Sequence, residues 1–86
     1  MAEGDDIRSG VRRFILESFL VGEPPESLQD STSLLTSGIV SSLAMLELVA
    51  FLEGEYAVTL HQDDLTADRL DSVDRIVTLV VERREG

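Results

Sequence analysis

The chain has 86 residues, of which 43% are hydrophobic and 28% charged, so it can bury one core but not two. Seventeen acidic residues outnumber seven basic ones, all of them arginine, and the resulting net charge of −10 argues against binding to nucleic acid or to anionic membranes. The absence of cysteine excludes disulfides and thiolate metal sites.

Neither a membrane span nor a signal peptide is predicted. The apolar run from Leu43 to Leu52 is interrupted by Glu47 and is far shorter than the ~20 residues of a spanning helix. The first residues are acidic where a signal peptide would be basic. We therefore expect a single cytoplasmic domain, monomeric, whose partners carry positive patches.

The first helix is predicted from Asp6 to Val21. Asp5 or Asp6 can cap its N-terminus, and Gly22 followed by two prolines ends it. Its apolar face comprises Ile7, Val11, Phe14 and Ile15, widened by Leu16, Phe19 and Leu20.

Residues 22–40 are predicted to form a long ordered loop. They are rich in glycine, proline, serine and aspartate, and loops of this length in compact domains are usually functional. The residues expected to hold the loop on the core are Leu28, Leu34, Leu35, Ile39 and Val40.

A strongly apolar second helix is predicted from Ser41, which can cap it, to Tyr56. Gly54 weakens its end by up to ~1 kcal/mol. The core-facing residues are expected to be Leu48, Val49, Phe51, Leu52 and Tyr56. That leaves an apolar, acid-rimmed face in solvent, composed of Leu43, Leu46, Glu47 and Ala50.

In the last third of the chain, the sequence predicts a short helical segment followed by a longer helix. Val58 to Leu60 alternates like a strand but has no partner strand, so it is predicted as loop. His61 to Leu70 is short and acidic and holds one or two helical turns. Asp71 or Ser72 then caps the last helix, with Asp74 completing a capping box. Its buried face comprises Val73, Ile76, Val77, Leu79 and Val80, and Arg83 and Arg84 lie where the helix dipole favours positive charge.

The predicted fold is therefore all-α: a small bundle of three main helices plus a short third helix, with the long loop between helices one and two.

Catalytic chemistry is not indicated. His61 is the only histidine and has no nucleophile motif beside it, so it is interpreted as an ordinary loop residue. We therefore expect that the protein is not an enzyme. The aspartates of the last third lack the spacing of a calcium loop and are interpreted as a solvated acidic face: Asp63, Asp64, Asp68, Asp71 and Asp74.

The serine pair Ser41-Ser42 opens the second helix, where free backbone N–H groups and the helix dipole favour a phosphate ester on a serine oxygen. The alternative is that both serines only cap the helix and the leucines only form core.

The run Gly38-Ile39-Val40-Ser41-Ser42-Leu43, followed by Glu47-Leu48-Val49, resembles the acyl carrier and peptidyl carrier protein family. In that family a G-x-D-S-L motif opens helix two, and its serine bears a 4′-phosphopantetheine arm from coenzyme A. The order of the predicted helices, the size and the acidity are similar over nearly the whole chain.

The resemblance implies that Ser42 carries 4′-phosphopantetheine. It also implies that partner enzymes contact Leu43, with Leu46, Glu47 and Ala50 extending the recognition face. Those partners are a phosphopantetheinyl transferase, an acyl- or aminoacyl-loading enzyme, and downstream synthases or transferases. One departure is Ser41 in place of the usual Asp, which makes Ser41 a rival attachment site.

The S-S-L-A-M run is similar to stand-alone carriers of specialised metabolism. The resemblance thus predicts a discrete acyl carrier of polyketide-type biosynthesis, such as that of antibiotics. The alternatives are an aminoacyl or peptidyl carrier of nonribosomal peptide-type biosynthesis, and an unmodified acidic helical adaptor.

Overall fold

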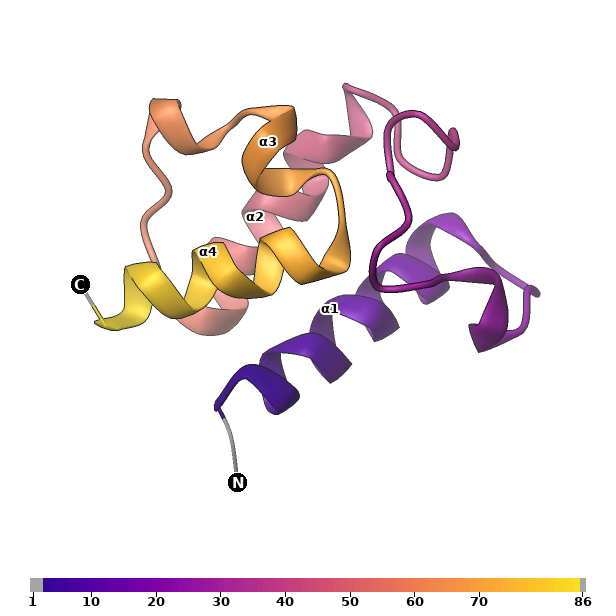
Figure 1. Ribbon diagram of the computed structural model, residues 1–86, viewed down its shortest axis with the longest axis horizontal. Helices are drawn as coiled ribbons and strands as arrows, with labels where there is room; N and C mark the ends of the chain where they lie inside the picture. The colour runs from indigo at the N-terminus through magenta and orange to yellow at the C-terminus, as the bar shows by residue number, and fades with distance from the viewer. Residues whose placement is uncertain (1–2, 86) are drawn as a thin grey trace.

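The computed structural model describes residues 3–85, and within that range the chain forms helices and no strand (Figure 1). The elements are α1 (Glu3–Phe19), the 3₁₀ turn η1 (Pro25–Ser27), α2 (Ala44–Tyr56), the 3₁₀ turn η2 (Gln62–Asp64), α3 (Ala67–Leu70) and α4 (Val73–Glu85). Helix α1 packs against α4 and α2, and the short α3 packs against α4. The predicted all-α bundle with a long loop between its first two helices is confirmed, and Val58–Leu60 is loop as predicted.

One hydrophobic core joins the helices to the loop. The helical residues without exposed surface are Ile7, Val11, Ile15, Leu48, Leu52, Val73, Ile76, Leu79 and Val80. From the loop, Leu28, Leu34 and Val40 are buried, whereas Leu35 and Ile39 are half-buried. The predicted anchoring of the loop by apolar residues is thus confirmed.

Helix α1 begins before its predicted cap. Asp5 and Asp6 lie inside the helix, which includes residue 3, so neither is its N-cap. Carboxylates in a first helical turn stabilise it through the helix dipole without needing the cap position. The helix ends at Phe19, and Gly22 reverses the chain with a positive φ of 84°.

Helix α4 is capped by Ser72, whose Oγ accepts the N–H of Arg75 at 3.2 Å. The predicted capping box with Asp74 is wrong, because Asp74 lies one position too early for that cap and pairs with Arg8 instead. Asp71, the other candidate cap, is engaged by the loop.

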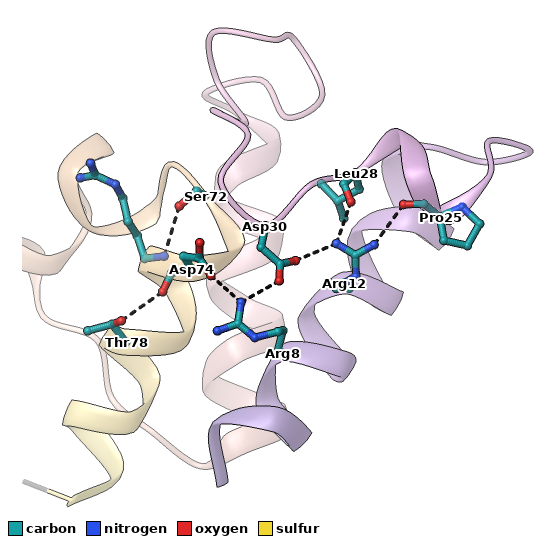
Figure 2. Close-up of polar contacts among 9 residues, drawn as sticks. Arg8, Arg12, Pro25, Leu28, Asp30, Ser72, Asp74 and Thr78 are labelled. Carbon is teal, nitrogen blue, oxygen red and sulfur yellow. Dashed lines mark hydrogen bonds and ion pairs between the residues drawn. The ribbon is translucent and has the colours of Figure 1, made fainter. Parts of the chain in front are cut away.

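Two arginines of α1 attach the first half of the loop to the bundle (Figure 2). The Nη1 atoms of Arg8 and Arg12 lie 2.9 and 2.8 Å from the two carboxylate oxygens of Asp30. Arg12 also donates to the carbonyls of Pro25 and Leu28. The Asp30 carbonyl accepts the N–H of Asp74 at 3.0 Å, so α1, the loop and α4 are joined at one place.

Candidate functional site

The second half of the loop is held by Asp71, which lies between α3 and α4. Its carboxylate accepts the hydroxyl of Ser33 at 2.6 Å and the N–H of Leu35 at 3.0 Å, and its carbonyl accepts the N–H of Leu34 at 2.7 Å. The hydrogen bond from Ser33 is the main cause that lowers the pKa of Asp71, while its burial opposes this. These hydrogen bonds therefore fix the loop residues 33–35 against Asp71.

A closed turn then carries the chain to the start of α2. The Val40 N–H donates to the Leu34 carbonyl at 3.0 Å, and the Gly38 N–H donates to the Leu35 carbonyl at 3.1 Å. Gly38 has a φ of 81°, a conformation that side chains disfavour. Because Val40 is fully buried, the next residues, Ser41 and Ser42, emerge at the surface.

The two serines have different roles. The Oγ of Ser41 accepts the N–H of Ala44 at 3.0 Å, and its carbonyl accepts the N–H of Met45 at 2.9 Å, so Ser41 satisfies the first donors of α2 as a cap does. The helix itself begins at Ala44, three residues later than predicted. The exposed Ser42 makes no side-chain hydrogen bond to any residue within 3–85. In the same range, the N–H groups of Ser42 and Leu43 make no backbone hydrogen bond. Ser42 therefore presents a free hydroxyl next to free helix-terminal donors.

A small cavity of about 160 Å³ adjoins Ser42 between α2 and α3. Besides Ser42, its lining comprises Leu35, Met45, Leu65, Thr66, Ala67 and Leu70. Sequence reasoning did not identify this cavity, because its far wall comes from a short segment that shows no helical period. The single available signal was Leu65, an isolated apolar residue in an acidic stretch, which is 42% exposed.

The predicted recognition face of α2 is exposed. Leu43 and Leu46 are 77% and 60% exposed, and Glu47 and Ala50 lie in solvent beside them. Of the residues predicted to fill the core, Leu48 and Leu52 are fully buried, whereas Val49, Phe51 and Tyr56 are half-buried. The four candidate contact residues are thus all exposed, and the first of them, Leu43, directly follows Ser42.

The predicted solvated acidic face needs a correction. Asp63, Asp68 and Asp74 are exposed, but Asp64 is buried against Arg83 and Asp71 is half-buried against the loop. A buried carboxylate needs ionic or hydrogen-bond partners, and both have them. His61 is exposed, as expected for an ordinary loop residue.

Comparison with known proteins adds no relative: no protein-family model matches the chain, and a search of curated proteins finds no significant match. Within residues 3–85, no helix combines the length and apolar character required to cross a bilayer.

Proposed function

We propose that this protein is an acyl carrier whose Ser42 bears 4′-phosphopantetheine. The observation that carries the proposal is that the Ser41 side chain is hydrogen-bonded to the start of the helix and the Ser42 side chain is not. The Ser41 hydroxyl oxygen accepts the first free N–H of α2, whereas Ser42 is exposed, without a side-chain hydrogen bond within residues 3–85, in the turn directly before the helix.

The departure from the family motif is compatible with this function. Serine and aspartate are equally good N-caps, so Ser41 can replace the usual Asp in starting the helix. What changes is the charge beside Ser42, because a hydroxyl replaces a carboxylate. A phosphate ester on Ser42 therefore has one fewer negative neighbour.

The residues around Ser42 suit the group. The free N–H groups of Ser42 and Leu43 can donate to phosphate oxygens, and the cavity beside Ser42 offers apolar walls with the hydroxyl-bearing Thr66 among them. When bound, 4′-phosphopantetheine supplies the thiol that a chain without cysteine lacks, and an acyl group is carried on it as a thioester.

Attachment is a balanced exchange at phosphorus. A bond forms between Ser42 Oγ and the phosphorus that bears pantetheine in coenzyme A, and the pyrophosphate bond of coenzyme A breaks to release adenosine bisphosphate. The serine proton passes to a base of the transferase. The chain's own contribution is to present Ser42 at the surface, directly before the N-terminus of α2.

Transport follows from tethering. A carrier docked on a partner presents its cargo at high effective concentration, and a weak, charge-steered interface lets it leave again. The exposed face formed by Leu43, Leu46, Glu47 and Ala50 suits such an interface, because apolar side chains are bordered by an acid. We expect a loading enzyme and a downstream synthase or transferase of polyketide-type metabolism to use it.

The decisive experiment is intact-protein mass spectrometry after incubation with coenzyme A and a broad-specificity phosphopantetheinyl transferase. We expect the mass gain of one phosphopantetheinyl group, retained in Ser41→Ala and Ser41→Asp and lost in Ser42→Ala. Circular dichroism should show that all variants are folded. A folded wild-type protein that gains no mass with several transferases contradicts the proposal and leaves an unmodified adaptor. Loading assays with acyl and aminoacyl substrates then separate the acyl carrier from the peptidyl carrier.

A further inference from the structure

Two stacked phenylalanines line the contact between α1 and α2 on the outside of the bundle. The rings of Phe14 and Phe51 have centroids 4.2 Å apart and planes 12° apart. Phe19 and Tyr56 extend them through edge contacts at 5.9 and 6.0 Å. All four of these residues, here called the aromatic seam, are only half-buried. Part of their aromatic surface therefore faces solvent.

A shallow groove follows this seam. One depression is lined by Phe14, Phe51, Ser18, Glu47 and Ala50. A second is lined by the same two phenylalanines with Gly10, Arg13, Glu17 and Glu55. Because both depressions share Phe14 and Phe51, they adjoin one another along the two helices.

The groove has more negative than positive charge. Glu17, Glu47 and Glu55 border it with a single arginine, Arg13. None of these three glutamates takes part in an ion pair or a side-chain hydrogen bond within the described range of the chain. Asp30, in contrast, is held by two arginines. The carboxylates of the groove are therefore available to an external cation.

We propose that this groove docks an arginine-bearing helix of a protein partner. A guanidinium can stack on an aromatic face while it forms paired hydrogen bonds with a carboxylate, and the groove provides both groups. A groove between two helices also suits the apolar face of an amphipathic helix.

A second copy of this chain fits poorly. Arg8, Arg12, Arg69, Arg75 and Arg83 are engaged in contacts within the chain. Two copies with a net charge of −10 each would also repel one another. The partner is therefore a different, basic protein surface. Ser42 does not line the groove, so the inference does not depend on modification of that serine.

The test is a titration of the ¹⁵N-labelled protein with a designed helical peptide of about 18 residues that carries two arginines one turn apart beside a leucine face. We expect saturable amide shifts centred on Phe14, Ser18, Ala50 and Phe51. A matched peptide with both arginines changed to glutamine should not saturate. Saturation by the glutamine peptide, or shifts centred on α3, would overturn the proposal.

Variants of the protein make the test specific. Glu17→Gln combined with Glu55→Gln should weaken binding about 5-fold, as expected for the loss of two exposed ion pairs. Asp63→Asn combined with Asp68→Asn removes the same charge from exposed positions elsewhere and should change affinity less than twofold. An equal loss in both double variants would show non-specific attraction and contradict a defined groove. Phe51→Leu, which keeps apolar volume, should also weaken binding; unchanged affinity in a folded variant would exclude stacking on that ring.

Discussion

Arg83 donates two hydrogen bonds to the carboxylate of Asp64, from Nε at 2.8 Å and from Nη2 at 2.6 Å. The pair joins the segment after α2 to the last turn of α4. Only 4% of the Asp64 side chain is exposed, against 33% of the Arg83 side chain, so water screens this partly buried ion pair less than a surface pair. This ion pair therefore fixes the segment that contains η2 to the C-terminal end of α4.

Asp64 should make stability depend on pH. The hydrogen bonds from Arg83, followed by the N–H of His61, lower the pKa of Asp64 to about 2 from an ordinary value of 3.8. A lowered pKa in the folded state adds stability above pH 3.8, and that stability is lost as pH falls through 2. Asp64→Asn should cost about 2 kcal/mol at pH 7 and progressively less towards pH 2, as measured by urea unfolding. As a control, Asp63→Asn at an exposed position should change stability by less than ~0.5 kcal/mol. If the difference in unfolding free energy between wild type and Asp64→Asn did not vary with pH, this explanation would be wrong.

The hydrogen bonds of Asp71 to the loop should contribute to the stability of the whole protein. Asp71→Asn leaves a weaker acceptor for Ser33 and Leu35, and we expect a loss of about 1.5–3 kcal/mol. Ser33→Ala should cost about 1 kcal/mol, and the double variant less than the sum, because the two residues share one hydrogen bond. Additive losses in this cycle would mean that the bond contributes nothing. Hydrogen exchange at Leu35 gives an independent local measurement.

A side chain at Gly10 should destabilise the protein, because Tyr56 would have to move to make room for it. A Cβ at this position would collide with the hydroxyl of Tyr56, which donates to the Ile7 carbonyl at 3.3 Å. Gly10→Ala should therefore lower the melting temperature despite the ~1 kcal/mol by which alanine is the better helix former. Tyr56→Phe removes the colliding oxygen, so Gly10→Ala should be less harmful in that background. The same loss in both backgrounds would locate the clash elsewhere.

Replacing Ala57 with glycine should stabilise the folded protein. It ends α2 with a left-handed φ of 54°, where alanine is strained and glycine is not. Ala57→Gly should stabilise by about 0.5–1 kcal/mol, less than the full 1–2 kcal/mol of left-handed strain because glycine makes the unfolded chain freer. Ala57→Val should destabilise, because a branched side chain tolerates this conformation even less. Thermal unfolding of both variants tests the sign, and a destabilised glycine variant would contradict it.

Helical periodicity predicted the parts of the fold that depend on neighbours in sequence. The buried stripe of α4 follows from spacing alone, as do the exposure of Leu43 and Leu46 and the position of Ser42 just before α2. The partners of Asp64 and Asp71 could not be predicted, because a carboxylate in an acidic stretch gives no sign of which distant donor it meets. Arg83 lies 19 residues from Asp64, and Ser33 lies 38 from Asp71. The cavity beside Ser42 could not be predicted either, because its far wall is a short segment without helical periodicity.

Tyr56 is the only tyrosine of a chain without tryptophan, so the near-ultraviolet spectrum reports mainly on a single hydroxyl between α1 and α2. Burial, followed by the charge of Glu55, raises the pKa of that phenol. The folded state therefore retains the proton more tightly than the unfolded chain, and stability is lost as alkaline pH rises through the folded pKa. Tyrosinate absorbance thus provides a label-free optical record of when these two helices separate.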